Sequence, residues 1–319
     1  MSIISKDIQK AVQLLNEEHL VAIPTETVYG LAGNIFSEKA IKSIFATKKR
    51  PFFNPLIVHV PSVASLNGIV THIPEKAKLL ANAFWPGAMT LVLKKHKNIP
   101  DLITAGKDTV AVRVPNHPVT LELLKQLPFP LAAPSANPFG SISPTKAKHV
   151  ANYFKNQLPM VLDGGACQNG IESTIIGFEN EVPVIYRLGA LALEDIEAVI
   201  GKIEVKNKKE DKPDAPGMLA RHYAPQTTTF LVDDVNYEIA KHRHKKIGVI
   251  VFEKSVNNAN VTEFILSEKG SKKEAAAKLY DTMHTLDHLN LDVIIAERFT
   301  EDGLGKSIND RLQRATFSS

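Results

Sequence analysis

The chain has 319 residues, of which 44% are hydrophobic and 23% charged, so we expect two globular domains rather than one. It contains no run of about 20 apolar residues that could span a membrane, and the start Met1–Lys6 does not resemble a signal peptide. The single cysteine, Cys167, excludes an intramolecular disulfide and a cysteine zinc cluster, and the net charge of +4 permits but does not require a nucleotide or RNA partner. We therefore expect a soluble, cytoplasmic protein.

Helix and strand patterns alternate along the first part of the chain. A helix is expected after Ser5, and Ser37 is expected to cap a second helix. Short apolar or alternating runs predict strands at Leu20–Ile23, Leu56–Val60, Thr90–Lys94, Val110–Val114, Leu131–Ala133 and Thr174–Phe178. This alternation predicts an α/β or α+β domain, for which we set the bounds 1–203.

A charged stretch, Lys202–Asp214, then interrupts the pattern, and we interpret it as a solvated linker in preference to an RNA-binding tail. We assign residues 204–227 to this linker and residues 228–319 to a second domain. Strands are expected there at Phe230–Val232, Lys246–Phe252, Glu263–Ser267 and Leu291–Ala296, with helices at Lys272–Leu289 and Gly305–Ala315. Such alternation predicts a small, parallel, Rossmann-like α/β domain.

The segment Pro24–Leu31 places two hydroxyls, a carboxylate and a phenol directly after a buried strand. Ligands of α/β proteins bind at the carboxyl ends of strands, so this segment is a candidate site. The structural alternative is a capped connection from a strand to a helix.

Three cations, Lys48 to Arg50, precede Pro51, and Asn54 and His59 follow. The helix macrodipole favours cations at a helix end, which is the structural explanation, but cations beside a sheet edge also suit phosphates. His59 lies in an apolar run, where a lone histidine is more often a core residue. Arg113 lies inside an apolar strand, so either a protein carboxylate or a ligand carboxylate must meet its charge.

The loop Ala133–Thr145 follows another short strand and combines small hydroxyl residues with Pro and Gly, a composition that suits phosphate binding. It matches neither the P-loop pattern nor the dinucleotide-binding glycine pattern. Polar groups also fall at strand ends in Asp163–Gly165, Glu172–Ile176 and Tyr186–Ala190, where each set alone is compatible with turn chemistry.

Together these segments resemble the YrdC/Sua family of L-threonylcarbamoyladenylate synthases, over essentially the whole chain. Pro24–Leu31, Lys48-x-Arg50-Pro51, Asn54–Leu56, Ser135-x-Asn137 and Ser173–Ile175 occur in the family's order, and the second domain with Ala215–Pro225 resembles its two-domain branch. The resemblance implies a twisted open sheet with a concave cavity, followed by a Rossmann-like unit. It also implies that L-threonine, bicarbonate and ATP give threonylcarbamoyl-AMP and pyrophosphate. Separate transfer proteins then modify an adenosine beside the tRNA anticodon.

The resemblance also assigns roles to single residues. The set implied for ATP is Arg50, Asn54, Thr109, Ser135, Ser143, Arg187 and Tyr223, and the set implied for threonine is Thr27, His59, Arg113, Ala133 and Ser173. Lys48 and Arg50 are expected at the phosphates and the transition state, without a firmly assigned catalytic residue. Magnesium is expected through phosphates and waters, with no metal site made by the protein.

Tyr223 would make the linker a lid, although Leu219 and Ala220 depart from the family pattern there and leave Arg221 as the cation. Two other functions stay open. One is a different carbamoyl transfer, although the single cysteine excludes the zinc segment of the larger carbamoyltransferases. The other is a module that binds structured RNA through a basic concave face.

Overall fold

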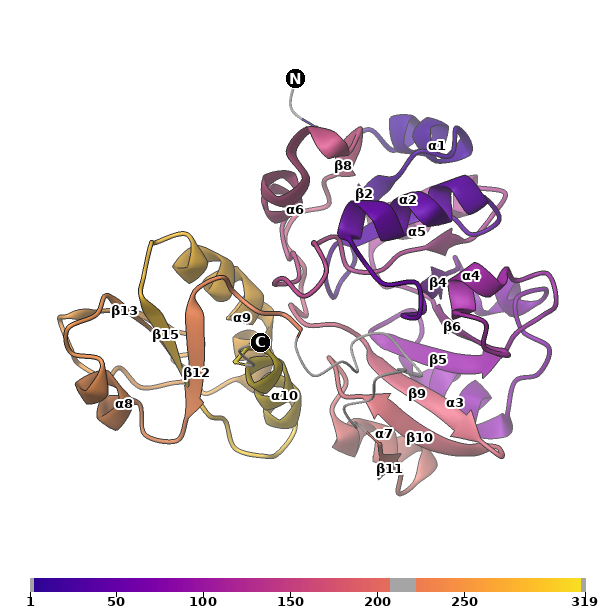
Figure 1. The fold of residues 1–319 in the computed structure, drawn as a ribbon. Helices are drawn as coiled ribbons and strands as arrows, with labels where there is room; N and C mark the ends of the chain where they lie inside the picture. Colours follow the sequence, from indigo (N-terminus) through magenta and orange to yellow (C-terminus); the bar gives the residue numbers. More distant parts are fainter. Residues whose placement is uncertain (1–2, 207–221, 317–319) are drawn as a thin grey trace.

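The computed structural model describes residues 3–206 and 222–316, so Leu219, Ala220 and Arg221 lie outside the described residues. The described chain forms two sheets with helices around them, one in each domain (Figure 1). This arrangement confirms the predicted α/β class and the separate parallel domain. The first sheet ends with β11 (Glu204–Val205), inside the residues we assigned to the linker, and the second begins with β12 (Thr228–Val232).

The first sheet has eleven strands in the order β1-β8-β2-β3-β7-β4-β6-β5-β9-β10-β11, with parallel and antiparallel neighbours. Besides β11, its strands are β1 (Ile4–Ser5), β2 (Val21–Ile23), β3 (Gly30–Asn34), β4 (Ile57–His59), β5 (Met89–Lys94), β6 (Thr109–Arg113), β7 (Leu131–Ala132), β8 (Met160–Leu162), β9 (Thr174–Glu179) and β10 (Val182–Arg187). The six strands predicted for this domain are confirmed within one or two residues at each end. We did not predict β3, which makes Pro24–Tyr29 a turn between antiparallel strands and not a connection to a helix.

The helices of the first domain are α1 (Ile8–Asn16), α2 (Glu38–Lys48), α3 (Glu75–Phe84), α4 (Asp101–Thr104), α5 (Pro118–Gln126), α6 (Ala147–Phe154) and α7 (Leu193–Ile200), with short 3-10 turns at Val63–Leu66 and Lys155–Gln157. Local chemistry sets the ends of α2. The Ser37 side chain accepts a hydrogen bond from the Ala40 amide, as predicted, and the helix ends at Lys48, followed by Lys49 in a left-handed conformation. The chain therefore turns sharply just before Arg50.

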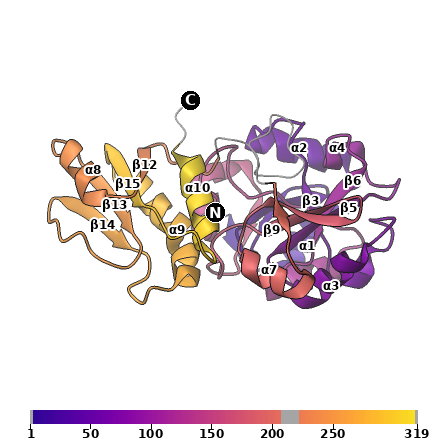
Figure 2. The same ribbon diagram turned by 90° about the horizontal axis from the view of Figure 1, so that it is seen from below.

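The second domain is a four-stranded parallel sheet in the order β12-β15-β13-β14. Its other elements are β13 (Ile247–Val251), β14 (Val261–Ile265), β15 (Val293–Glu297), α8 (Val235–Lys241), α9 (Lys272–Asp287) and α10 (Gly305–Ala315). Helices α9 and α10 lie on the side of this sheet that faces the first domain, whereas α8 lies on the far side (Figures 1 and 2). The second domain therefore presents two helices to the first.

The interface between the domains includes a buried apolar cluster. One cluster of buried side chains joins Val28, Ile142 and Ile171 of the first domain to Leu279 and Met283 of α9. None of the described helices is both long enough and apolar enough to cross a bilayer.

Candidate active site

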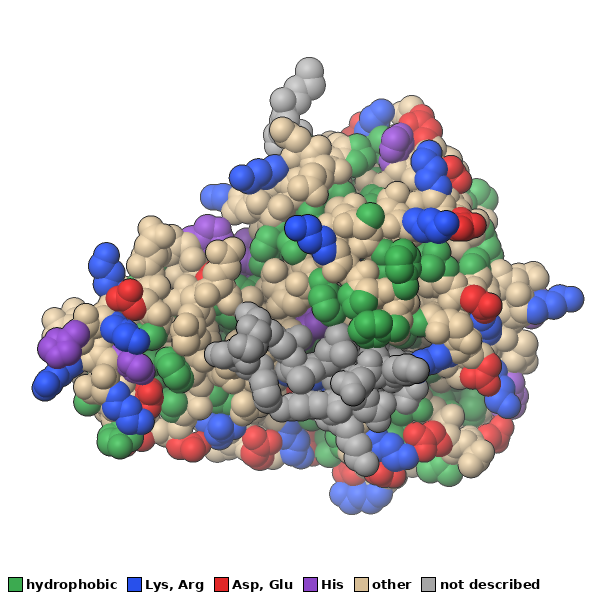
Figure 3. Space-filling view, viewed as in Figure 1, with side chains coloured by type: hydrophobic (Ala, Val, Ile, Leu, Met, Phe, Trp, Pro, Cys, Tyr) green, Lys and Arg blue, Asp and Glu red, His purple; other side chains and the backbone are tan. Residues whose placement is uncertain are grey.

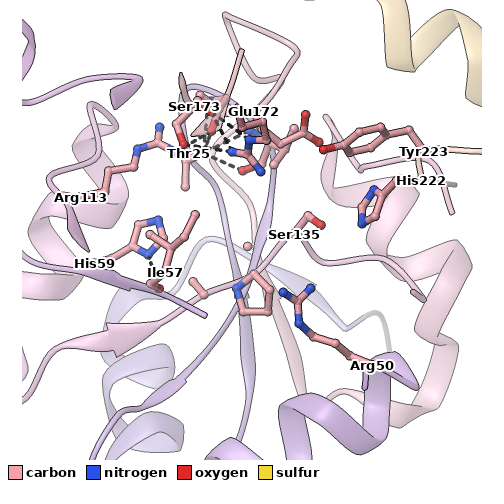
Figure 4. A pocket seen from close by; sticks show the side chains of 16 residues that line it. Thr25, Arg50, Ile57, His59, Arg113, Ser135, Glu172, Ser173, His222 and Tyr223 are labelled. Carbon is pink, nitrogen blue, oxygen red and sulfur yellow. Dashed lines mark hydrogen bonds between the residues drawn. The ribbon is translucent and has the colours of Figure 1, made fainter. Parts of the chain in front are cut away.

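A cavity lies in the first domain where its central strands end, and the start of the second described segment closes one side of it (Figure 4). Its lining residues are Thr25, Thr27, Val28, Gly30, Arg50, Ile57, His59, Arg113, Ala133, Pro134, Ser135, Glu172, Ser173, Arg187, His222 and Tyr223. The cavity volume is about 50 Å³. Ligand pockets commonly measure about 300–1,000 Å³, so this cavity is narrower than a typical ligand pocket.

Arg113 at the end of β6 meets a protein carboxylate inside the cavity wall. Its Nη2 lies 2.6 Å from Oε1 of Glu26, and both side chains are buried. Neither Glu26 oxygen has a well-aligned hydrogen-bond donor among the described residues, so the contact is an ion pair without a hydrogen bond. The guanidinium also donates to the Gly87 carbonyl and to Oγ1 of Thr27, at 3.1 and 3.0 Å. The turn after β2 therefore holds Arg113 in place.

His59, at the end of the neighbouring strand β4, pairs in register with Arg113. Its Nδ1 lies 3.2 Å from the Ile57 carbonyl, which can only accept, so Nδ1 carries the proton and Nε2 presents a lone pair. Burial, and then the charge of Arg113, lowers the pKa of His59 to about 3. His59 is therefore a neutral hydrogen-bond acceptor beside a cation.

Arg50 lies across the cavity from His59 and Arg113, on the side of His222 and Tyr223 (Figure 4). Within the described residues its hydrogen bonds go to neutral oxygens, with Nη2 2.6 Å from Oδ1 of Asn54 and 2.8 Å from the Pro55 carbonyl. No carboxylate pairs with it among residues 3–206 and 222–316. Burial is the main cause that lowers the pKa of Arg50, and Arg187 adds to the shift. A buried cation without a carboxylate is a favourable position for an anionic ligand.

Arg187, at the end of β10, joins this cationic side. Its Nε and Nη2 donate to the Ser173 carbonyl at 3.2 and 2.8 Å. The Ser173 hydroxyl in turn lies 2.7 Å from Oγ1 of Thr90. The ends of β5, β9 and β10 are thus tied together by one hydrogen-bonded group.

Glu172 is an ionised carboxylate in the same wall. Burial alone would raise its pKa, but Arg311 and Arg187 hold the pKa below its usual value. Its two oxygens accept from Ser143 in the first domain and from Tyr280 and Arg311 in the second. The wall of the cavity is therefore shared between the domains.

His222 and Tyr223 cover the cavity from the second described segment, with ring centroids 4.1 Å apart. Tyr223 is buried, and its hydroxyl has no hydrogen-bond partner among the described residues. The Nδ1 atom of His222 likewise lacks a partner there, and burial lowers the pKa of this histidine well below its usual value. Two polar groups without partners thus border the cavity at the end of the expected lid.

The structure brings together nine of the residues expected at the site. These are Arg50, Ser135, Arg187 and Tyr223 of the set expected for ATP, and all of the set expected for threonine, namely Thr27, His59, Arg113, Ala133 and Ser173. Asn54 and Ser143 lie behind the lining residues. Arg50 donates a hydrogen bond to Asn54, and Ser143 donates one to Glu172.

Lys48 and Thr109 lie elsewhere. The buried ammonium of Lys48 donates to the carbonyls of Ser135 and Asn137, at 2.6 and 2.5 Å, so it supports the Ser135 loop from behind. Thr109 is at the start of β6, roughly 13 Å along the strand from Arg113, and borders separate depressions with Val92 and Phe178. Their expected contacts with ATP stay predictions.

The lining or supporting residues without an assigned role in the sequence include Glu26, Glu172 and His222. The first two lie inside the motifs that we singled out, and their carboxylates meet arginines from distant parts of the chain. His222 lies beside Tyr223 in the segment that carried the resemblance. For all three residues, their place in a motif could have indicated that they lie at the site. It did not indicate which residues they contact.

Comparison with known proteins gives the same family. The Sua5/YciO/YrdC family model, described as telomere recombination, matches residues 13–189, and a model described as the C-terminal domain of threonylcarbamoyl-AMP synthase matches residues 191–316. The threonylcarbamoyl-AMP synthase of Pyrococcus abyssi is 42% identical, with 97% of this chain and 94% of that protein covered. The Bacillus subtilis synthase is 39% identical, with 97% and 92% covered.

The crystal structure of P. abyssi Sua5 complexed with L-threonine superposes with a TM-score of 0.91 at 41% identity, covering 98% of this chain and 96% of that one. The chain belongs to the Sua5/YciO/YrdC family, in its two-domain form.

Proposed function

We propose that this chain is an L-threonylcarbamoyladenylate synthase, which forms threonylcarbamoyl-AMP and pyrophosphate from L-threonine, bicarbonate and ATP. The observation that carries the proposal is the division of one cavity into two sides. Arg113 and His59 lie on one side, whereas Arg50 lies on the other with Tyr223 (Figure 4). Relatives that are threonylcarbamoyl-AMP synthases match nearly the whole chain.

On the first side we assign the threonine carboxylate to Arg113, whose planar donors suit a carboxylate. The neutral Nε2 of His59 would accept a hydrogen bond from the threonine hydroxyl or amine, and Thr27 adds a hydroxyl beside Arg113. Because His59 stays neutral over the physiological pH range, it can accept without adding a second positive charge.

On the second side Arg50, Ser135 and Arg187 would hold the triphosphate. The threonine amine and bicarbonate first give a carbamate with loss of water. A carbamate oxygen then attacks the α-phosphorus, and the bond from that phosphorus to the bridging oxygen breaks as pyrophosphate leaves. The two arginines would lie where charge develops, and fixed cations in such a position favour this kind of transfer.

Magnesium would accompany the triphosphate. The described residues contain no group of three or more His, Cys, Asp or Glu side chains able to hold a metal ion. The ion would be held mainly by phosphate oxygens and water, as is common for magnesium.

The narrow volume of the cavity supports a lid. Substrates cannot enter about 50 Å³, so His222 and Tyr223 would move away to admit them and return to exclude water from a labile product. The downstream partners we propose are threonylcarbamoyl-transfer proteins and tRNA, with the reaction in the cytoplasm. On the coloured part of the face in Figure 3, cations alternate with Asp and Glu, which does not favour the alternative of an RNA-binding surface.

The deciding experiment measures pyrophosphate release from ATP with and without L-threonine and bicarbonate. Release that needs both supports the proposal, and L-serine in place of L-threonine is the matched control for the methyl group. Release that does not depend on threonine would overturn it.

A further inference from the structure

Two helices of the second domain reach the nucleotide side of the cavity through a set of buried contacts. Arg311 of α10 is fully buried, and its Nε lies 2.8 Å from Oε2 of Glu172. The hydroxyl of Tyr280 in α9 donates to the same oxygen at 3.0 Å. The other Glu172 oxygen accepts from Ser143 at 2.6 Å, so one carboxylate joins both domains to a residue that we assign to ATP.

The same two side chains also contact Tyr223. The Tyr280 ring stacks on the Tyr223 ring with centroids 5.7 Å apart, and the Arg311 guanidinium lies 5.0 Å from the centre of the Tyr223 ring. Tyr223 is therefore held from behind while its hydroxyl stays without a partner among the described residues.

Helix α10 also fixes the backbone that follows Arg187. Nη2 of Arg311 donates to the Leu188 carbonyl at 2.7 Å, and the Ser307 hydroxyl donates to the Gly189 carbonyl at 2.8 Å. Because Arg187 directly precedes these carbonyls, its position at the end of β10 depends on the docked helix.

The threonine side has no direct polar support from the second domain. Among the described residues, no hydrogen bond, ion pair or ring contact joins Thr27, His59, Arg113 or Ser173 to the second domain, and their polar partners lie in the first. On this side the second domain makes only an apolar contact, through Val28 beside Thr27. Its direct polar contacts therefore lie on the nucleotide side of the cavity.

We infer that Tyr280 and Arg311 are positioning residues for ATP, which act through Glu172, Tyr223 and the backbone after Arg187. The second domain is thus a part of the nucleotide site and not only a neighbour of it. This inference rests on the assignment of the two substrate sides in the proposed function. It deepens that assignment by giving the second domain a role toward one substrate.

The test measures the binding of ATP alone and of L-threonine alone to the full chain by titration calorimetry. Arg311→Gln should weaken ATP binding about 10- to 100-fold, the factor that corresponds to the loss of a charge-assisted hydrogen bond. Threonine binding should change by a much smaller factor, because Thr27, His59 and Arg113 have their polar partners in the first domain. The matched control is Lys306→Gln, on the same helix, which removes a half-exposed ion pair to Glu194 across the same interface and should leave both affinities unchanged.

Tyr280→Phe keeps the ring stack and removes only the bond to Glu172, so it tests the inference if Arg311→Gln does not fold. It should also weaken ATP binding selectively, by a smaller factor. Equal losses for both substrates, or the same loss in Lys306→Gln, would mean that the interface is merely structural and would overturn the inference. Since both ligands are titrated without turnover, a wild-type chain that binds both but releases no pyrophosphate would refute the proposed activity alone.

Discussion

Arg113 and Glu26 form a buried ion pair, with 2.6 Å between Nη2 and Oε1, at the position where a threonine carboxylate is proposed to bind. The protein thus neutralises this cation before any substrate arrives. A threonine carboxylate would then share the guanidinium with Glu26 and Thr27, so binding need not begin from an uncompensated charge.

Arg113→Gln should weaken threonine binding much more than ATP binding. It should also lower the free energy of unfolding by about 3–5 kcal/mol, because Glu26 is left as an unpaired buried charge. Calorimetry with each substrate and denaturant unfolding measure the two effects.

The double variant Glu26→Gln/Arg113→Gln separates them. It should regain much of the stability, because no unpaired charge remains, while threonine binding stays weak. Glu38→Gln, in an exposed pair with Lys42, is the control for a surface charge. Equal losses of threonine and ATP affinity in Arg113→Gln would show that the carboxylate assignment is incorrect.

Lys48→Met should destabilise the fold as well as weaken ATP binding. The Lys48 ammonium bonds two buried carbonyls of the Ser135 loop, and each unpaired buried group costs about 1–3 kcal/mol. Denaturant unfolding and ATP titration measure the effects, and Lys42→Met on an exposed face of the same helix is the control. Unchanged stability and ATP affinity with slower pyrophosphate release would instead favour the direct phosphate contact expected from the sequence.

Hydrophobic patterning was enough to predict most of the strands that build the cavity. Runs such as Val110–Val114 are mostly apolar, as a buried strand requires, so the local sequence alone predicts the strand. Strand β3 was missed because Gly30–Asn34 has two glycines and no alternation, and its pairing with β2 and β7 forms it instead. The alternation of apolar and polar residues does not predict a strand that forms because neighbouring strands pair with it.

The motifs indicated which residues gather at the site, but not which way their side chains point. The sequence Lys48 to Arg50 does not indicate whether the Lys48 side chain points toward phosphate or toward the Ser135 loop. The structure shows that it points toward the loop. The pairing of Glu172 with Arg311 joins residues of different domains, so no local pattern encodes it. Most positions were therefore predictable, with Lys48 and Thr109 as exceptions, whereas partners were not.

Tyr223→Phe should have opposite effects on stability and on binding. The hydroxyl is buried without a partner among the described residues, so its removal should leave the free energy of unfolding unchanged or raise it by up to about 1–3 kcal/mol. If the hydroxyl bonds to the nucleotide, ATP affinity should fall. Thermal unfolding and ATP titration measure the two effects, with exposed Tyr237→Phe as the control. Unchanged ATP affinity would remove Tyr223 from the nucleotide contacts.

His59 should make the fold sensitive to acid. Its pKa is about 3 in the folded protein, mainly because of burial and then because of Arg113, against an ordinary value of 6.5. Between these pH values the unfolded chain binds the proton and the folded chain does not. The stability from His59 is therefore complete above about pH 6.5 and falls with decreasing pH, by up to about 1.4 kcal/mol per pH unit.

Denaturant unfolding between pH 7 and pH 5 measures this slope. His59→Asn should reduce the slope of unfolding free energy against pH by the contribution of one histidine. His19→Asn, at an exposed position, should leave the slope unchanged. Because the buried His284 also has its pKa lowered to about 3, mainly by burial, the His59 variant should keep part of the slope. An identical slope in the wild type and in His59→Asn would mean that His59 already binds a proton in the folded protein, and it would then be unable to act as the neutral acceptor proposed for threonine.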